Sequence, residues 1–368
     1  MKLNRYLKGL GRSFACILFP LTIFGQINIT FPTSRIVFQR DNFGNGIIHI
    51  TGHYSKSLEK VEARVVPMGH GQGEQTDWRV IQDNPQGGFY SGTLNVRGGW
   101  YELQVRGIIN GNTVSTAELQ RVGVGEVFLV AGQSNALGFL NYGAPGPGVD
   151  RVNCVNYRNN DNQNNSFPRP DFVRMSDNGN VGPRGLSSWC WGRLGDMIAN
   201  RLNVPVLFYN AAWEGTASKN WSETVDGGTT RSIYINDTYP QGQPYGNLRM
   251  ALNYFANVTG IRAILWHQGE ADNQLNTSSG QYASNLRSVI EKSRQHFGKT
   301  VGWVVSRASY YNSKGSYQQV INGQNEVVTG GNSVYFGPST DGMQVPRPDG
   351  FHFQNGGLSD LANAWNSA

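Results

Sequence analysis

The sequence predicts a small all-β sandwich followed by a larger α/β domain in which helices cover both faces of a parallel sheet. Two observations support this fold class. Residues 27–122 consist of short strand-like runs separated by turn residues. After Gly123-Val124-Gly125, helix-spaced apolar residues alternate with unbroken apolar runs, a pattern typical of strands joined by helices. We therefore divide the chain into residues 1–26, 27–122 and 123–368.

Residues 1–26 differ in composition from the rest of the chain and indicate an export signal. Four basic residues come first: Lys2, Arg5, Lys8 and Arg12. An apolar stretch over residues 14–24 and the small residue Gly25 follow. This stretch is shorter than the roughly 20 apolar residues that span a bilayer, and Pro20 interrupts it. We expect a secreted or periplasmic protein with no membrane anchor after the signal is cleaved.

Composition excludes several classes of protein. With 38% hydrophobic and 15% charged residues, the chain is neither disordered nor a membrane protein. Without residues 1–26 it carries 27 basic and 25 acidic residues and has no basic patch, so we expect no nucleic-acid partner. Cys154 and Cys190 could form a disulfide after export or remain buried thiols. The oligomeric state is not predictable from the sequence.

The first domain is predicted from seven short strands whose spacing suits an antiparallel sandwich. These strands cover residues 35–39, 47–54, 61–66, 78–82, 89–96, 100–109 and 113–122. The sandwich could bind sugar or brace the second domain.

The second domain is predicted to contain five parallel strands with right-handed helical crossovers. The strands cover residues 127–131, 204–212, 261–266, 301–306 and 333–336. Residues 139–189 show no periodicity, so this long segment is either a functional loop or a disordered insertion.

Ser134 lies where the first of these strands ends, directly after Gly132-Gln133. Reactive groups collect beyond the carboxyl ends of strands in open α/β sheets, which makes Ser134 a candidate nucleophile. A serine that caps the next helix is the alternative interpretation.

Other loops predicted at the same edge supply the remaining groups that serine acyl transfer needs. Residues 213–216 follow the second strand, residues 267–270 follow the third, and residues 349–352 precede the last helix. Asp349, three residues before His352, can orient that imidazole as the base for Ser134. His267 is the alternative base, but it adjoins a buried strand.

Four blocks in this order resemble the SGNH hydrolases. They are Gly132-Gln133-Ser134-Asn135, the Gly215 loop, Trp266-His267-Gln268-Gly269-Glu270-Ala271-Asp272 and Asp349-Gly350-Phe351-His352-Phe353. More narrowly, they resemble the branch that contains sialate O-acetylesterases and the acetylxylan esterases of carbohydrate esterase family 6. The resemblance extends from about Glu126 to the end of the chain and implies a flavodoxin-like, three-layer α/β/α domain.

This resemblance also implies roles for individual residues. Ser134 would be the nucleophile, His352 the general base and acid, and Asp349 its orienting partner. The backbone N–H groups of Ser134 and Gly215 would form the oxyanion hole with the side chain of Gln268. Such enzymes typically need no metal or other cofactor, in keeping with histidines that form no ligand cluster.

Further residues have two possible roles each. Glu270 could support an oxyanion-hole loop or form a salt bridge. Arg347 could meet an acidic sugar or be an exposed arginine without a role. One or two of four tryptophans could stack on sugar, the others being buried. These are Trp189, Trp191, Trp213 and Trp221.

The sequence thus predicts a secreted serine esterase that removes O-acetyl groups from a carbohydrate of the sialic acid or xylan type through an acetyl-enzyme. A glycan-binding protein that kept the fold without activity is one alternative. A general lipase or thioesterase is another, although Gly132-Gln133-Ser134-Asn135-Ala136 lacks the second glycine of the G-x-S-x-G motif.

Overall fold

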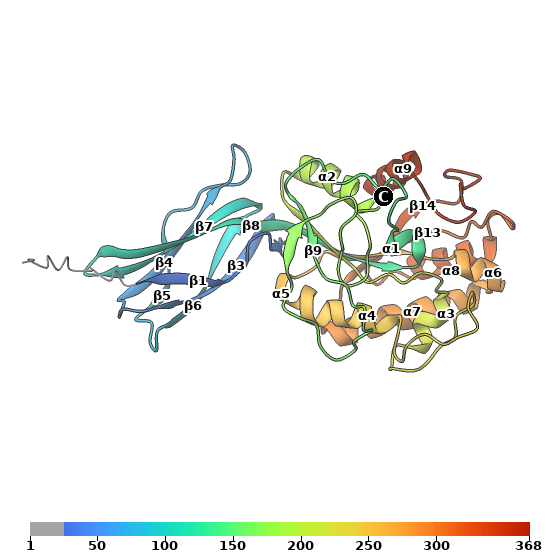
Figure 1. Ribbon diagram of the computed structural model, residues 1–368, viewed down its shortest axis with the longest axis horizontal. Coiled ribbons are helices and arrows are strands. Elements are labelled where there is room, and N and C mark those ends of the chain that lie inside the picture. Colours follow the sequence, from blue (N-terminus) through green and yellow to red (C-terminus); the bar gives the residue numbers. More distant parts are fainter. Residues whose placement is uncertain (1–25) are drawn as a thin grey trace, which may run out of the picture.

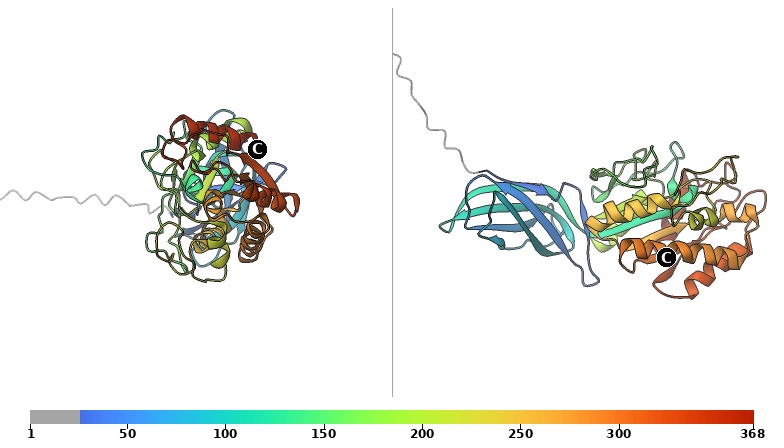
Figure 2. Two further views of the ribbon diagram at one scale, coloured as in Figure 1. Left: turned by 90° about the vertical axis from the view of Figure 1, so that its right-hand side faces the viewer. Right: turned by 90° about the horizontal axis from the view of Figure 1, so that it is seen from below.

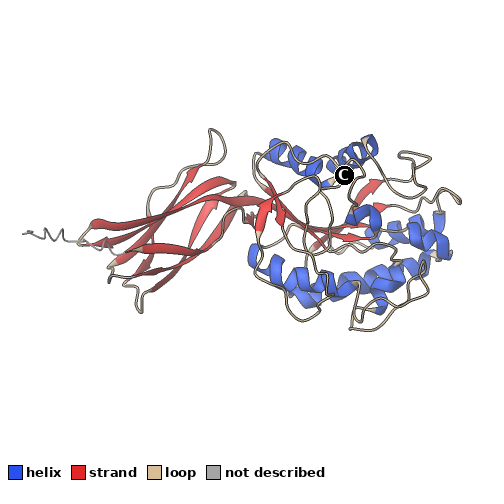
Figure 3. Ribbon diagram, in the orientation of Figure 1, coloured by secondary structure: helices blue, strands red, loops and turns tan. Residues whose placement is uncertain are grey.

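The computed structural model describes residues 26–368 and has two parts that lie end to end along its long axis (Figures 1 and 2). One part consists of strands only, whereas the other combines a sheet with helices (Figure 3). The predicted export signal, residues 1–26, lies outside the described residues except for Gln26. Among the described residues, no helix is long and apolar enough to cross a membrane.

The N-terminal part contains two groups of paired strands and no helix among described residues 26–132. One antiparallel sheet has the order β1-β3-β6. In the other, β4 pairs with β5 and β7, and β8 pairs with β7 and β2. The strand bounds are β1 (Ile27–Phe31), β2 (Val37–Gln39), β3 (Asn45–Tyr54), β4 (Lys60–Pro67), β5 (Arg79–Asp83), β6 (Phe89–Arg97), β7 (Gly99–Ile109) and β8 (Asn112–Gly132).

Strand β8 connects the two parts without a break. Its first half pairs with β7, and its second half, from Glu126, pairs with strands of the α/β sheet. The boundary predicted between residues 122 and 123 therefore falls inside one strand. Whether residues 27–122 form a separate domain stays a prediction.

A buried carboxylate reinforces this junction. Glu126 of β8 is 4% exposed. It accepts hydrogen bonds from Arg40 Nε and Arg262 Nε, each at 2.7 Å, and from Gln39 Nε2 at 3.1 Å. Burial alone would raise the pKa of Glu126, but these contacts lower it. Because Arg40 follows β2 and Arg262 precedes β12, this ionised group ties the strand-only part to the α/β part.

The central sheet of the second part has the order β10-β9-β11-β8-β12-β13-β14. All of its pairings are parallel except that of β10 with β9. The predicted count of five parallel strands is one short, because β9 lies in the segment that showed no periodicity. Its four residues include the buried Asn153, too few and too polar for a recognisable apolar run. The further bounds are β9 (Val152–Val155), β10 (Phe172–Arg174), β11 (Val206–Asn210), β12 (Ala263–His267), β13 (Gly302–Arg307) and β14 (Val334–Ser339).

Helices cover both faces of this sheet (Figure 1). Alternate side chains of β8 separate the faces: Val127 and Leu129 pack in one apolar cluster with residues of η1, α7 and α8, whereas Val130 packs in another with α2 and α9. The bounds are α1 (Ser134–Leu137), α2 (Trp191–Leu202), α3 (Ser218–Glu223), α4 (Tyr245–Met250), η1 (Ala251–Ala256), α5 (Asn257–Thr259), α6 (Glu270–Leu275), α7 (Ser279–Phe297), α8 (Gln318–Thr329) and α9 (Gly356–Ser367).

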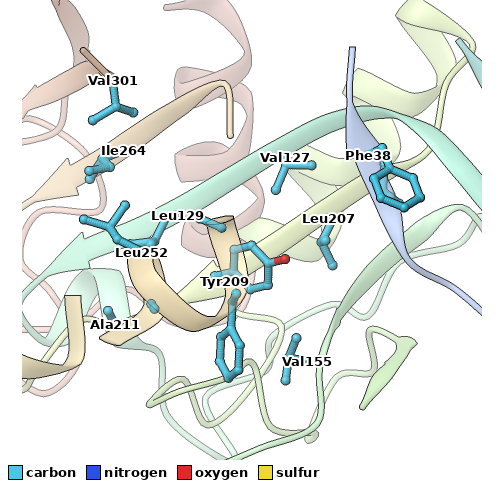
Figure 4. Packing of buried hydrophobic residues seen from close by; sticks show 14 of the residues in the cluster. Phe38, Val127, Leu129, Val155, Leu207, Tyr209, Ala211, Leu252, Ile264 and Val301 are labelled. Carbon is cyan, nitrogen blue, oxygen red and sulfur yellow. The ribbon is translucent and has the colours of Figure 1, made fainter. Parts of the chain in front are cut away.

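The larger cluster is continuous across the junction of the two parts. Phe38 of β2 belongs to it, as do Val127 of β8 and Leu207 of β11 (Figure 4). In the other cluster, Cys154 and Cys190 are both buried and both free thiols, so no disulfide joins them.

Candidate active site

The end of β8 places Ser134 at the carboxyl edge of the sheet. Gly132 has φ +130°, and a Cβ there would lie 2.1 Å from the carbonyl oxygen of His267, so this close approach of β8 and β12 requires glycine. Helix α1 begins at Ser134, and its N-cap position belongs to Gln133, without a side-chain cap. The helix-capping interpretation of Ser134 therefore does not fit this geometry.

Ser134 lines a cavity of about 300 Å³. His352, from the loop before α9, lines the same cavity, as does Gly215 from the loop after β11. The complete lining consists of Gln133, Ser134, Asn135, Phe139, Glu214, Gly215, Tyr234, Glu270, Phe351 and His352. The fold thus brings residues from all four predicted loops to one cavity.

Asp349 orients the ring of His352. Its Oδ2 lies 2.8 Å from His352 Nδ1, and its Oδ1 accepts the backbone N–H groups of Phe351 at 3.0 Å and His352 at 2.8 Å. Tyr142 donates its hydroxyl to the same Oδ2 at 3.1 Å. One carboxylate therefore fixes both the loop backbone and the imidazole.

The charge state of Asp349 determines the tautomer of His352. Burial alone would raise the pKa of Asp349, but hydrogen bonds from the backbone and ring of His352 and from the backbone of Phe351 lower it to about 2. An ionised carboxylate only accepts hydrogen bonds, so the Nδ1 of His352 carries a hydrogen. In the neutral ring, Nε2 is then left as a proton acceptor.

Aromatic rings surround His352. Its centroid lies 4.8 Å from that of Phe139 and 5.8 Å from that of Tyr142, both edge-on. No hydrogen bond joins the side chains of Ser134 and His352 in the described part of the chain, although both line the cavity. Such bonds are often long in ligand-free sites and tighten when substrate binds.

Several residues that line the cavity have a backbone N–H without a protein acceptor among residues 26–368. They include Ser134, the first residue of α1, and Gly215. Gly215 has φ +67°, a left-handed conformation that glycine adopts without strain. Both residues are those expected to form the oxyanion hole.

Gln268 does not fit the role of third oxyanion donor. It does not line the cavity, and its Nε2 already lies within hydrogen-bond distance of Asp272 Oδ2 at 2.6 Å, Thr216 O at 3.1 Å and Gln133 Oε1 at 3.1 Å. An amide nitrogen has two hydrogens, so none is left for an oxyanion.

Gln133 has the opposite arrangement. Its Oε1 accepts from Gln268 Nε2 and from the backbone N–H groups of Gly269 at 3.3 Å and Ala271 at 3.2 Å. Because backbone N–H groups only donate, this end of the amide must be the oxygen. The Nε2 has no protein partner in the described chain, and Gln133 lines the cavity next to Ser134.

Glu270 lines the cavity and supports the His352 loop through Asn135. Asn135 Nδ2 donates to Glu270 Oε1 at 2.8 Å and to the Phe351 carbonyl at 3.0 Å, and Asn135 Oδ1 accepts from Phe353 N at 3.2 Å. Burial alone would raise the pKa of Glu270, but contacts with His267, Arg347 and Asn135 hold it below its usual range.

Arg347 does not face substrate, contrary to the prediction that it meets an acidic sugar. It is 2% exposed and lies 3.6 Å from Glu270. Its guanidinium donates to the carbonyls of Phe351 at 2.9 Å and Thr340 at 3.3 Å. The apolar rings of Phe353 and Tyr310 cover it. Arg347 therefore supports the loop of His352 from within.

None of the four tryptophans proposed to stack on sugar lines the cavity. Trp189 and Trp191 donate their indole N–H groups to the carbonyls of Asn135 and Ala136, which fixes α1. Trp221 is fully buried, and Trp213, 7% exposed, lies under the guanidinium of Arg184. The indole N–H of Trp221 donates to Thr216 Oγ1 at 2.9 Å, so three of the four indoles hold segments that adjoin the cavity.

Aromatic side chains that the sequence did not single out form the cavity wall instead. Phe139, Tyr234 and Phe351 line it. Only Phe351 lies inside a recognised block; Phe139 and Tyr234 come from irregular segments whose position no periodicity reveals. No cluster of three or more metal-binding side chains occurs within residues 26–368.

Comparisons with known proteins agree with this architecture. Residues 124–367 match the family model described as carbohydrate esterase, sialic acid-specific acetylesterase. The structure is similar to that of a carbohydrate acetylesterase from Xanthomonas citri, with a TM-score of 0.56 and 16% sequence identity over 92% of this chain and 74% of that one. A protein from Arabidopsis thaliana has a TM-score of 0.45 and 17% identity over 66% of this chain and 96% of that one.

None of the curated proteins matches the chain. The family model, however, spans more than half of it and contains all four blocks noted in the sequence. The predicted resemblance is thus confirmed: the chain belongs to the carbohydrate esterase family of sialic acid-specific acetylesterases and is a carboxylic ester hydrolase.

Proposed function

We propose that this protein removes O-acetyl groups from carbohydrates through an acetyl-enzyme on Ser134. One arrangement carries the proposal: Ser134, the His352 ring oriented by Asp349 and Gly215 all line one cavity, and the N–H groups of Ser134 and Gly215 have no protein acceptor among residues 26–368. Serine acyl transfer needs a nucleophile, an oriented base and donors for the oxyanion. Family membership supports an acetylated carbohydrate over the substrates of a general lipase.

In the first step, His352 Nε2 takes the proton of the Ser134 hydroxyl while Oγ attacks the acetyl carbonyl. The carbonyl oxygen becomes an oxyanion that the N–H groups of Ser134 and Gly215 stabilise. Collapse of this intermediate breaks the bond to the sugar oxygen, which takes the proton from His352. The sugar leaves, and the acetyl group remains on Ser134.

In the second step, His352 takes a proton from water, and the hydroxide attacks the acetyl-enzyme. Collapse releases acetate, and the proton on His352 returns to Ser134 Oγ. Asp349 stays ionised throughout, because its pKa of about 2 lies far below neutral pH. It stabilises the protonated ring without taking part in proton transfer.

Gln133 supplies the third oxyanion donor in this proposal. Its Oε1 is engaged by three donors, from Gln268, Gly269 and Ala271, which leaves Nε2 as the end of the amide without a protein partner in residues 26–368. Gln268 acts on the oxyanion only indirectly, by donating to Gln133 Oε1. The positively charged start and apolar run in residues 1–26 support export of the protein before it acts.

Replacement of Ser134 tests the function. We expect Ser134→Ala to lower acetate release from acetylated sugars and para-nitrophenyl acetate by about 10³-fold or more, since no other serine, threonine or cysteine lines the cavity in the described part of the chain. Ser57→Ala, an exposed serine between β3 and β4 of the strand-only part, is the control. Mass spectrometry of the wild type mixed rapidly with the aryl ester should show one added acetyl group. Binding of acetylated sugar without turnover would instead favour the glycan-binding alternative.

Two variants test Gln133 as an oxyanion donor. Gln133→Leu removes the donor, and Gln133→Glu keeps an oxygen for the N–H groups of Gly269 and Ala271 but turns a second acceptor toward the oxyanion. We expect both to lower kcat by about 10²-fold with little change in KM. A purely structural role predicts that Gln133→Glu retains activity, and that result would exclude the donor role. Gln318→Leu, on the exposed side of α8, is the control.

A further inference from the structure

The charged groups around the cavity are unevenly distributed. Two carboxylates, Glu214 and Glu270, line it, whereas no lysine or arginine is among its lining residues. Glu270 is 2% exposed and bonded to Asn135 beside Arg347, so its charge is compensated inside the protein. The side chain of Glu214 is 45% exposed. Glu214 pairs with Arg184 Nη2 at 3.4 Å, but its carboxylate stays open to solvent and is the negative group of the cavity that an incoming substrate can reach.

The two arginines that pair with the lining carboxylates do not offer a binding site for a substrate carboxylate. Arg184 is 8% exposed, its guanidinium lies 3.6 Å from the centre of the Trp213 ring, and its Nη2 already faces Glu214 at 3.4 Å. Arg347 is buried against Glu270. Strong recognition of a carboxylate needs an accessible guanidinium with N–O distances of about 2.8 Å. Neither arginine can supply one without leaving its partners.

The lining suits a neutral sugar. A carboxylate such as that of Glu214 accepts hydrogen bonds from sugar hydroxyl groups, and the rings of Phe139, Tyr234 and Phe351 provide apolar surfaces for sugar C–H groups. An acidic sugar would bring its own carboxylate into a partly desolvated cavity beside Glu214, where like charges repel more strongly than in water.

We propose that Glu214 makes the site selective for O-acetyl esters of neutral sugars and disfavours O-acetylated sialic acids. Glu214 adjoins Gly215 and both line the cavity with Ser134, so a hydroxyl near the reacting ester lies within reach of the Glu214 carboxylate. Glu214 discriminates between the two kinds of sugar electrostatically, because its carboxylate repels the carboxylate of an acidic substrate. This proposal rests on the esterase function proposed above.

Competing substrates test the selectivity. We expect the wild type to show a kcat/KM about tenfold or more higher for an acetylated xylo-oligosaccharide than for an O-acetylated N-acetylneuraminic acid at low ionic strength and neutral pH. Added salt should raise the rate on the acidic substrate and narrow the gap, because salt screens charges that solvent reaches. This comparison requires no variant, so it cannot fail through misfolding.

Variants of Glu214 then identify the residue responsible. Glu214→Gln keeps the shape and should raise the acidic-to-neutral ratio of kcat/KM about tenfold, and Glu214→Arg should raise it further. Glu326→Gln, at a carboxylate of similar exposure paired with Arg287, should leave the ratio unchanged. A wild type that prefers the sialic acid ester, or a ratio that Glu214→Gln does not alter, would overturn the proposal.

The same assays separate this selectivity from the underlying function. Para-nitrophenyl acetate carries neither a sugar nor a carboxylate, so its Ser134-dependent hydrolysis reports the esterase alone. If the protein hydrolyses the aryl ester but prefers the sialic acid ester to the xylo-oligosaccharide ester, the role proposed for Glu214 is overturned and the esterase function stands. Loss of hydrolysis of every ester would overturn both.

Discussion

Two loops at the carboxyl edge of the sheet each carry a histidine and a carboxylate three residues apart, yet their environments differ. In the loop before α9, Asp349 and His352 lie 2.8 Å apart with side chains 29% and 18% exposed. In the loop after β12, His267 and Glu270 lie 3.7 Å apart with side chains 0% and 3% exposed. His352 lines the cavity, whereas His267 does not.

This difference teaches that the spacing of an acid and a histidine does not by itself define a catalytic pair. His352 donates its Nδ1 hydrogen to Asp349 and has Nε2 available. Both ring nitrogens of His267 are buried and have no hydrogen-bond partner in the described chain. A base must reach the proton that it abstracts, and His267 is fully buried beside Phe353 and Trp365 and does not line the cavity that Ser134 lines.

The largest expected effect separates the two histidines. His352→Ala should lower kcat/KM by about 10³-fold or more, because Ser134 loses its base. His267→Leu should change kcat/KM by less than about tenfold, since His267 does not line the cavity and reaches it only through its 3.7 Å contact with Glu270. Steady-state rates on para-nitrophenyl acetate for both variants, with circular dichroism to verify folding, provide the measurement. Comparable losses for folded forms of both variants would contradict the assignment.

Much of this site could be predicted because the residue types and their order along the chain carry the chemistry. Ser134 after a buried strand, and Asp349 three residues before His352, are visible without coordinates. The parallel sheet was predictable for the same reason, since buried strands such as β11 and β12 are unbroken apolar runs. The short strand β9, with Asn153 inside it, has no such signal.

Side-chain direction could not be predicted. Gln133 and Gln268 are chemically identical amides, and only the positions of Gly269 N, Ala271 N and Asp272 show which of them has a free donor. Arg347 is a charged residue that sequence reasoning placed at the surface, but the charge of Glu270 and two carbonyl oxygens make its burial possible. Both the free donor of Gln133 and the burial of Arg347 depend on partners that lie far away in the sequence.

A smaller effect, on stability, distinguishes the two carboxylates. Glu270→Gln should lower the free energy of unfolding by about 3 kcal/mol, because it leaves the buried guanidinium of Arg347 without its counter-charge. Asp349→Asn should cost about 1 kcal/mol near neutral pH, since its partly exposed site weakens the interaction. Glu326→Gln, at an exposed ion pair, should cost less than about 0.5 kcal/mol. Urea unfolding of the three variants measures these losses in the free energy of unfolding and tests their order.

The effect of Asp349→Asn should also depend on pH. The pKa of Asp349 is lowered to about 2 in the folded protein, below the value of about 3.9 expected for an unfolded aspartate. The carboxylate therefore stabilises the fold fully above the unfolded pKa, and this contribution is lost as pH falls through the folded pKa. The difference in unfolding free energy between wild type and variant should be smaller at pH 3 than at pH 7. A difference that grows on acidification would mean that Asp349 is not held ionised by His352 and its loop.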